Sequence, residues 1–426
     1  MREGQRSTGG AAGRTVPRTH RTDGGYGTAV DRWWRRAVPA PWLLIVITAS
    51  VLILTGCVAR ESPGSPSALA SRHVRASPSV PTASPRSVAP TATVPPQLPT
   101  LPGYLVSLAE LRERAELARD GVEPHEAAID ELVAWADGAV DDRPRPERSL
   151  RITGTGGPFV EDARRAYGLA LAFAITGDDE YADRARSTVL AWVDRTTELR
   201  NACSDSGSCQ TSLIVARMVP AFVFAADLLQ QADAWSESDR RALSEWLADL
   251  VLPVMPRLDN NWGDAGNLAE LVITDYLGDE DGFRASLRRW ERRLDLLGAD
   301  GDLPEETRRG DQGMSYTQEA LVYKVAAAAI AERRGIDLWE IENRDGVTLR
   351  AALDYLADYW NRPEAWPWHD DPDVPSPGPL WELAYAHWCD AVYLEIAEGR
   401  RPYGDRGNSA IRWTTLTSGT QDAECS

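Results

Sequence analysis

The sequence predicts an all-α domain whose antiparallel helices close into an α/α toroid, and three observations predict this fold class. From about residue 105 onward, apolar residues recur at the helical positions i, i+3, i+4 and i+7. Convincing strand-like alternation is not found, and short turns rich in Gly and Asp separate the helical segments. No fixed-period repeat of the solenoid kind is present. We therefore expect a closed ring rather than an open array of helices.

The helical segments number about eleven, and we expect those within residues 101–400 to form one domain. Antiparallel hairpins of this number commonly form a toroid, and their loops at one end are free to build a cleft. The segments with helical periodicity are 105–120, 125–140, 160–177, 180–196, 213–231, 237–255, 264–278, 280–297, 315–334, 347–361 and 379–397.

The first 57 residues predict a signal or a membrane anchor. Arginines precede an apolar run from Trp42 to Cys57, as expected on the cytoplasmic side of a signal. The run ends in Leu-Thr-Gly-Cys, which looks like a bacterial lipobox and predicts that Cys57 is lipidated after cleavage. The alternative is an uncleaved single span, because residues 37–59 are long enough to cross about 30 Å of hydrocarbon. Both alternatives place the rest of the chain at the outer face of the cytoplasmic membrane.

Two further segments lie outside the expected toroid. Residues 58–100 are rich in Pro, Ser, Ala and Thr without apolar periodicity, so they cannot bury enough surface to offset their ordering entropy. We expect a disordered linker there. Residues 401–426 are assigned to a C-terminal tail.

Four cysteines remain once Cys57 is set aside. Their even number and an oxidising location predict two disulfides, most simply Cys203 with Cys209 and Cys389 with Cys425. A metal site is not expected, because no histidine lies at ligand spacing from either pair.

The charge of the chain limits its partners. The formal net charge is -18, and removing the 12 basic and four acidic residues of positions 1–100 leaves 34 basic against 60 acidic residues, a net of -26. This balance argues against nucleic acid and against an anionic membrane surface as the main partner. A polyanionic substrate would need cationic groups gathered in one cleft.

Two polar motifs interrupt the helical pattern. In LDNNWGDAGN, residues 258–267, either an Asn or Asp caps a helix that starts near Asp264, or the polar cluster has a function. In RRGDQGMSYTQ, residues 308–318, Ser315 opens a capping box and Tyr316 falls in the first helical turn. The positive helix end and Arg309 would both favour a phenolate, so Tyr316 is a candidate general base. The alternative is an ordinary surface turn.

These motifs together resemble the alginate lyase domain of polysaccharide lyase family 5. The resemblance rests on Asn-Asn-x-Gly, then D-G-x-L-P-E-E-x-x-R-G, then a tyrosine seven residues after the arginine. The segments RRAYGLALAFAITGDDEYADRARSTVLAWVD and GPLWELAYAHW are similar to other parts of that family, and the likeness covers roughly residues 105–400. It implies an incomplete α/α toroid that cleaves a uronic-acid polymer, alginate or a related one, by β-elimination without metal or other cofactor.

The resemblance also implies residue roles. Asn261 would donate a hydrogen bond to the substrate carboxylate, Arg309 would pair with it, and Tyr316 would remove the C5 proton and protonate the leaving oxygen. Asn260, Trp262 and Arg308 are assigned to substrate binding. The family usually has histidine where this chain has Trp262, which cannot accept a proton. A syn elimination by Tyr316 is therefore expected, and His369 or His387 would be needed for a second base.

Tryptophan is frequent in this chain, which has 16 of them. Trp366 and Trp368 stand in a Pro-rich loop and are candidate platforms for a sugar ring. Two other functions stay open at this point. One is an inverting glycoside hydrolase on a similar toroid, which would use two carboxylates. The other is a lipoprotein that binds uronates without cleaving them, which the missing histidine would explain.

Overall fold

The computed structural model describes residues 100–420 and residue 425. The expected signal or anchor of residues 1–57, with Cys57, and the linker up to residue 99 lie outside the described residues. Both expected disulfides, Cys203–Cys209 and Cys389–Cys425, are present.

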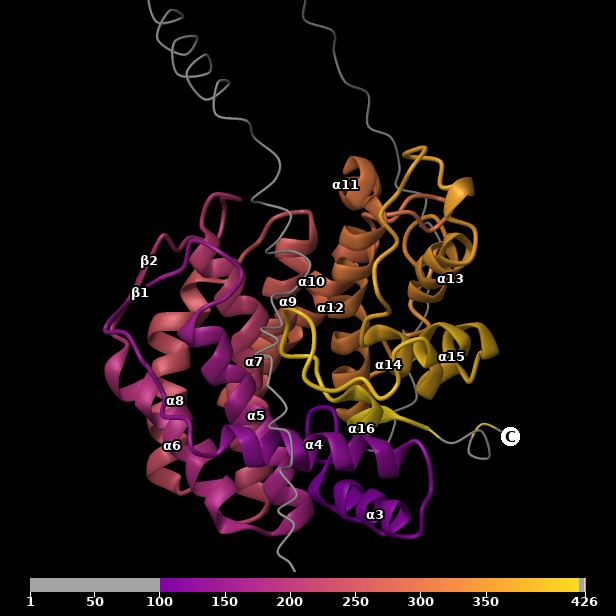
Figure 1. Cartoon of the computed structure of the whole chain (residues 1–426). Coiled ribbons are helices and arrows are strands. Elements are labelled where there is room, and N and C mark those ends of the chain that lie inside the picture. The colour runs from indigo at the N-terminus through magenta and orange to yellow at the C-terminus, as the bar shows by residue number, and fades with distance from the viewer. Residues whose placement is uncertain (1–99, 421–424, 426) are drawn as a thin grey trace, which may run out of the picture. The chain divides into compact units, whose positions relative to one another are not determined.

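The described residues form an all-α domain, as expected (Figure 1). Its α-helices are α3 (Leu108–Arg119), α4 (His125–Ala139), α5 (Pro158–Thr176), α6 (Asp179–Arg195), α7 (Gln210–Gln231), α8 (Glu237–Trp246), α9 (Asn261–Leu277), α10 (Glu280–Leu294), α11 (Pro304–Thr307), α12 (Gly313–Arg333), α13 (Leu349–Trp360), α14 (Leu380–Trp388), α15 (Ala391–Glu398) and α16 (Thr414–Ser418). Further short helices are the π-helix η1 (Leu247–Val251) and the 3-10 helices η2 (Leu252–Val254), η3 (Gly310–Gln312) and η4 (Pro363–Ala365). The strands β1 (Ser149–Arg151) and β2 (Glu198–Arg200) pair in parallel, with Leu150 opposite Leu199. Three-residue strands are too short to leave an alternating pattern in the sequence.

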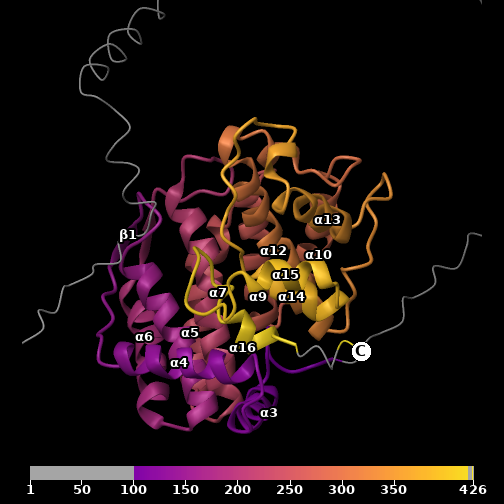
Figure 2. The same ribbon diagram turned by 45° about the vertical axis from the view of Figure 1, so that its right-hand side comes forward.

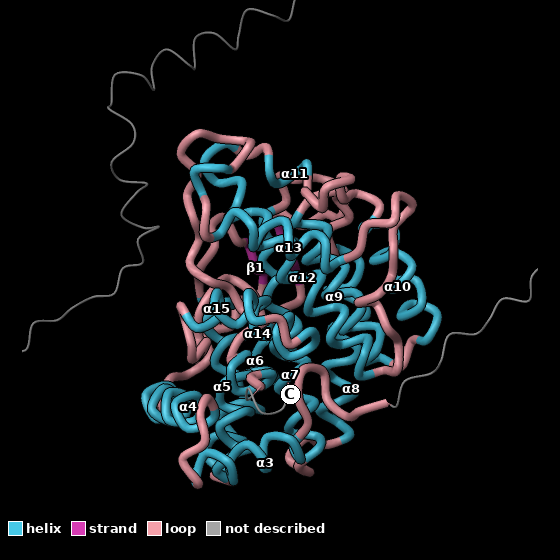
Figure 3. Tube along the Cα trace, turned by 90° about the vertical axis from the view of Figure 1, so that its right-hand side faces the viewer, coloured by secondary structure: helices cyan, strands magenta, loops and turns pink. Residues whose placement is uncertain are grey.

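The helices are arranged as an α/α toroid. Consecutive inner helices α5, α7, α9, α12 and α14 pack against one another, while α6, α10, α13 and α15 pack on α5, α9, α12 and α14 from outside. The apolar side chains of this arrangement form one contiguous core. Figure 3 shows how nearly the whole described chain is taken up by helices and their connecting loops.

Residues 401–420, which the sequence assigned to a tail, pack into the domain, so this assignment is wrong for them. Arg412, Trp413 and Leu416 are buried there, and α16 packs on α14, α3 and α4 (Figure 2). The segment is too short and irregular to show helical periodicity. Its position in the core therefore follows from tertiary packing alone.

Several helix ends differ from expectation. Helix α9 begins at Asn261 rather than near Asp264, and α12 begins at Gly313 without a side-chain cap, so the capping box expected at Ser315 is wrong. The single helix expected over 379–397 is divided into α14 and α15 because Cys389 adopts a left-handed conformation, with φ of 52°.

Helix α7 is the one helix among the described residues that is long and apolar enough to cross a membrane. Within its apolar window 94% is buried inside the domain. Because α7 packs against both α5 and α9, we describe it as a core helix of the inner ring.

Candidate active site

Three segments meet where two inner helices begin. The backbone N–H of Asn261, the first residue of α9, donates to Glu306 Oε1 of α11 at 2.5 Å. Helix α12 begins only six residues after α11, beyond the turn η3. The starts of α9 and α12 therefore lie at the same end of the toroid, beside α11.

The start of α9 is fixed by its cap and by a close backbone approach. Asn260 is the N-cap, and its Oδ1 accepts from the N–H of Trp262 at 3.1 Å. A Cβ at Gly263 would lie 1.7 Å from the carbonyl oxygen of Leu258, so a larger residue could not occupy this position without moving the backbone. The cap expected in this motif is thus present, three residues earlier than predicted.

Asn261 is completely buried, yet its side chain has unused hydrogen-bonding capacity. Neither Nδ2 nor Oδ1 has a hydrogen-bond partner among the described residues. An unsatisfied buried amide costs about 1–3 kcal/mol, and such groups call for a functional explanation. The amide of Asn261 is therefore a candidate ligand-binding group.

Glu306 connects Asn261 to Arg309. Besides accepting from the Asn261 N–H, it places Oε2 3.0 Å from Arg309 Nε, as an ion pair that lacks hydrogen-bond alignment. Burial raises the pKa of Glu306 to about 7, against the opposing effects of Arg309 and the Asn261 N–H. The carboxyl group therefore titrates near neutral pH while it joins two candidate site residues.

Arg309 and Tyr316, which the sequence paired, lie together. The guanidinium carbon of Arg309 is 4.4 Å from the centroid of the Tyr316 ring, and Arg309 Nε also donates to the Glu305 carbonyl at 2.8 Å. The turn between them depends on Gly310, whose φ of 63° favours glycine. Tyr316 is half-buried, one turn into α12, so its ring faces a fixed cation without being enclosed.

Burial raises the pKa of two other tyrosines, Tyr323 and Tyr355. Tyr323 lies on α12 two turns after Tyr316, and burial raises its pKa. Its hydroxyl donates to Glu319, which also pairs with Arg217 of α7. Burial raises the pKa of Tyr355 to about 12. Neither tyrosine has its ring against an arginine as Tyr316 does.

A buried charge cluster lies behind the site. Asp264 of α9 accepts from Arg293 Nε of α10 at 2.5 Å and from Lys324 Nζ of α12 at 2.7 Å. Burial opposes ionisation of Asp264, but the two cations outweigh it and lower its pKa, whereas burial lowers the pKa of Lys324. A cleft of about 350 Å³ is lined by Asp264, Lys324 and Glu306. The cluster ties three helices together immediately behind Asn261.

Arg308, Trp366 and Trp368 were predicted to bind substrate, and of these three only Trp366 is placed differently than expected. Arg308 is exposed, with its guanidinium carbon 5.1 Å from the ring centroid of half-buried Trp368. Trp366, in contrast, is only 4% exposed and packs edge-on against Tyr355 and Tyr359. Its loop turns inward onto α13, so its ring is not available to stack on a sugar.

Trp262 is half-buried against the core, and the two remaining candidate histidines have other partners. His387 stacks on Trp339 with centroids 4.3 Å apart, and its Nδ1 lies 3.5 Å from Glu332. Glu332 is 16 residues after Tyr316 on α12, about 24 Å along the helix. His369 is exposed, 2.9 Å from the carbonyl of Asp371.

Neither Glu306 nor Lys324 was predicted for a uronate site, although Glu306 was one of several acids considered for a glycoside hydrolase. Glu306 was one acid among many and stood out only by preceding Arg309 in the motif. Lys324 carried a signal that was overlooked, because it is the single lysine among 46 basic residues. Its ammonium shares the buried carboxylate of Asp264 with the guanidinium of Arg293.

Comparisons with known proteins find alginate lyases. A model of the alginate lyase family matches residues 112–366. No curated protein matches the chain in sequence. Among solved structures, an alginate lyase from Bacteroides ovatus is 18% identical with a TM-score of 0.59, over 76% of this chain and 100% of that one.

Further similar structures are those of alginate lyase A1-III from Sphingomonas species A1. The enzyme itself is 18% identical with a TM-score of 0.60, over 76% of this chain and 98% of that one. A histidine-to-alanine variant of A1-III bound to a tetrasaccharide is 17% identical with a TM-score of 0.59, over 76% and 97% of the two chains. At these identities the likeness establishes a shared fold.

Proposed function

We propose a mechanism from the premise that the chain belongs to the alginate lyase family and is a polysaccharide lyase acting on uronate polysaccharides. The proposal is a β-elimination in which Tyr316 transfers the proton while Asn261 and Arg309 neutralise the substrate carboxylate. The observation that carries it is the Arg309 guanidinium over the Tyr316 ring, joined through Glu306 to the start of α9 at Asn261.

The chemical difficulty of this reaction lies at C5 of the uronate. Removing the C5 proton places a second negative charge next to the carboxylate, so the proton is only weakly acidic. Donors and a cation aimed at the carboxylate stabilise the charge that develops in the transition state. An arginine suits this role because its guanidinium pairs with a carboxylate through two hydrogen bonds and stays charged.

In the proposed reaction Tyr316 first accepts and then donates the same proton. The Tyr316 phenolate takes the C5 proton, the C5–H electron pair forms the C4=C5 double bond, and the bond from C4 to the glycosidic oxygen breaks. The leaving oxygen then receives the proton from the Tyr316 hydroxyl, which restores the phenolate. One residue on one face of the sugar is enough for this syn elimination.

In the proposed mechanism Asn261 binds the substrate carboxylate and Glu306 positions Arg309. The unsatisfied amide of Asn261 supplies an N–H donor for a carboxylate. Glu306 holds Arg309 in place before substrate arrives, at the cost of partly offsetting its charge. A substrate carboxylate would therefore compete with Glu306 for Arg309.

Trp262 bears on the range of substrates. It stands where the family usually has histidine and cannot accept a proton, so a substrate that requires a base on the face opposite Tyr316 would be cut poorly. Alginate or a related polyuronate is the proposed substrate class. Complexes of alginate lyase A1-III variants with a tetrasaccharide support an oligosaccharide ligand for the shared fold. The net charge of -26 over residues 101–426 favours short or partly neutral uronates over long polyanions.

The test is a panel of uronate polymers and oligomers incubated with the purified chain, followed by the ultraviolet absorbance of the conjugated C4=C5 bond. We expect absorbance to rise with wild type and to be abolished in Tyr316→Phe and Arg309→Ala. A carboxylate-based hydrolase would keep its activity in Tyr316→Phe and give no absorbance. Binding without any absorbance would instead favour a uronate-binding protein.

We also propose that the domain is attached to the outer face of the cytoplasmic membrane through a lipid on Cys57 or through an uncleaved span. The lipobox-like residues before Cys57 and the two disulfides, which are typical of oxidising compartments, support this location. Labelling cells with a fatty acid should mark the wild type but not Cys57→Ala. An unlabelled chain that keeps its first residues in mass spectrometry would favour the span.

A further inference from the structure

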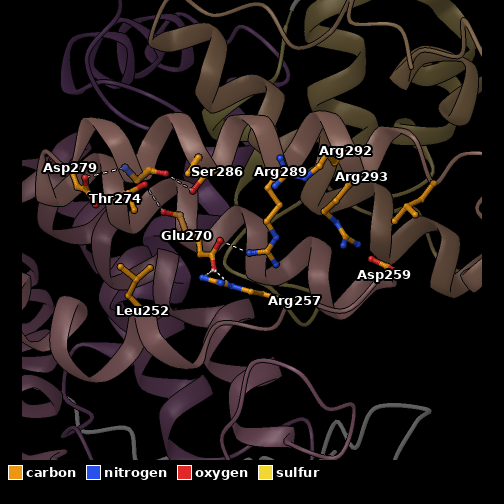
Figure 4. Close-up of a pocket in the computed structure, with 13 residues that line it drawn as sticks. Leu252, Arg257, Asp259, Glu270, Thr274, Asp279, Ser286, Arg289, Arg292 and Arg293 are labelled. Atoms are coloured by element: carbon orange, nitrogen blue, oxygen red, sulfur yellow. Dashed lines mark hydrogen bonds and ion pairs between the residues drawn. The ribbon is translucent and has the colours of Figure 1, made fainter. Parts of the chain in front are cut away.

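A cleft rich in arginine is lined by residues of α9, of α10 and of the segment between η2 and α9, and Tyr316 is not among its lining residues. It has a volume of about 530 Å³ and includes Arg257, Arg289, Arg292 and Arg293 in its lining. This volume falls within the range of small-molecule sites. Figure 4 shows Arg289 reaching from α10 toward Glu270, with Arg257 on the other side of the same carboxylate.

The cationic character of this cleft contrasts with the rest of the domain. Helix α10 carries five arginines against three acids in 15 residues, whereas residues 101–426 have a net charge of -26. Burial lowers the pKa of Arg289, and although Glu270 opposes this, Arg293 and Arg257 lower it further. Guanidinium groups that lie close together repel one another, so binding of an anion among them is favourable.

The half-buried Arg289 and the buried Arg293 are held by partners within the protein. Arg289 pairs with Glu270 and donates to the carbonyl of Pro256 at 2.6 Å. Arg293 bonds Asp264 and the carbonyls of Leu258 and Asn260. These two residues form the floor of the cleft and hold its shape.

The other two arginines, Arg257 and Arg292, are exposed and can contact a ligand. Arg257 has both Nε and Nη2 3.1 Å from Glu270 Oε1, which orients the side chain while 64% of it stays exposed. Arg292 is exposed and makes no ion pair with any described residue. The acids of the lining do not cancel them, because Glu270 lies between two arginines and Asp279 caps α10 at the far end. Asp259, beside Arg293, restricts that end of the cleft.

We propose that this cleft is a second binding site for uronate carboxylates, separate from the site at Tyr316. The inference rests on the proposed function for the identity of the ligand. The lining of α10 extends from Gly282 to Arg293, about 17 Å along the helix, which suits a short stretch of an acidic saccharide. A polymer that occupies both sites would gain affinity through effective concentration, which would offset its repulsion by the acidic domain.

The experiment measures binding of a uronate oligomer to the full chain carrying Tyr316→Phe, which removes turnover, by calorimetry at low salt. We expect two sites per chain. Arg257→Ala combined with Arg292→Ala should abolish one of them and weaken binding of a long polyuronate about tenfold. Arg292→Glu changes a single exposed residue and should give a similar loss of binding. It keeps the proposal testable if the double variant does not fold.

The matched control is Arg284→Ala, which removes the same charge from α10 outside the cleft, at an exposed residue paired with Glu280. It should leave both sites intact. A neutral oligosaccharide should not compete, and inorganic sulfate as a further probe separates a general anion site from a saccharide site. One site per chain, unaffected by Arg292→Glu, would overturn the proposal.

The two proposals fail separately. The absorbance assay on wild type decides whether the chain is a β-eliminating lyase, independently of the cleft. Uronate binding that depends on Arg257 and Arg292 without any absorbance would retain the cleft and reject the mechanism. Absorbance with a single uronate site per chain would support the mechanism and reject the cleft as a binding site.

Discussion

The guanidinium carbon of Arg309 lies 4.4 Å from the ring centroid of Tyr316, and the same guanidinium is paired with Glu306. One cation thus contacts both the proposed proton-transferring ring and a carboxyl group that titrates near neutral pH. Its planar shape matters for this double contact, since it stacks on a ring through its face and pairs through its edge.

Arg309→Lys tests whether charge alone is sufficient. Lysine keeps the positive charge but lacks the planar fork, so we expect kcat/KM to fall about a hundredfold, with a larger loss for Arg309→Ala. Initial rates of double-bond formation measure both. A lysine variant as fast as wild type would remove the fork from the mechanism.

Glu306→Gln should change how stability depends on pH. The folded-state pKa of Glu306 is raised to about 7 from a usual value of 4.5, so its folded form holds the proton more tightly than the unfolded chain does. Its contribution to stability is therefore present below pH 4.5 and lost as pH rises to about 7. Between these limits the free energy of unfolding of the variant should gain about 3 kcal/mol relative to wild type. Denaturant unfolding of both proteins across this range measures the difference, and parallel curves would contradict the expectation.

Asn261→Leu should separate stability from activity. Leucine removes a buried amide that has no partner, in a similar volume, while the backbone N–H still donates to Glu306. We expect the melting temperature to stay the same or rise, because the unsatisfied amide costs about 1–3 kcal/mol, while double-bond formation is lost. If the variant instead melts far below wild type, the amide is a structural group with a partner in solution.

Removing the two disulfides should have unequal effects. The cysteines of Cys389–Cys425 are 36 positions apart in sequence and those of Cys203–Cys209 only six, so the chain-entropy model predicts losses of about 4 and about 2 kcal/mol in the free energy of unfolding. Cys425→Ser and Cys209→Ser, unfolded in denaturant, give the two values. An equal loss in both variants would point to native-state packing rather than loop length.

Asp264→Asn should be more damaging than Lys324→Met. The first change leaves both Arg293 and Lys324 buried without their carboxylate, which costs about 3–5 kcal/mol. The second leaves Asp264 still paired with Arg293, so its cost is smaller. The free energies of unfolding of the two variants, compared at neutral pH, decide the order. A reversed order would assign the cluster's stability to the ammonium.

Periodicity predicted the toroid because most helices show an apolar face, and the motif that paired Arg309 with Tyr316 named two side chains that the structure brings together. The start of α12 was missed because Ser315 fits a capping pattern, whereas the helix starts at Gly313 by continuing the turn η3. Residues 401–420 were missed because their burial depends on contacts with α3, α4 and α14, which no local pattern records.

The placement of the tryptophans shows the same limit. Trp366 and Trp368 are two residues apart in one Pro-rich loop, and composition cannot separate them. Tertiary packing buries Trp366 against Tyr355 and Tyr359 and leaves Trp368 beside Arg308. Likewise, the importance of Glu306 depends on its contact with Asn261, 45 residues earlier in the chain.

The burial of Lys324 gives the protein a built-in chemical reporter. Because the chain has no other lysine, its side-chain amine reactivity belongs to one group that is 3% exposed and engaged by Asp264. Amine-directed reagents should therefore leave the side chains of the folded domain unmodified and react with Lys324 only when α9, α10 and α12 separate. The rate of that labelling, read by mass spectrometry on a single peptide, would follow opening of the region behind the candidate active site without any engineered probe.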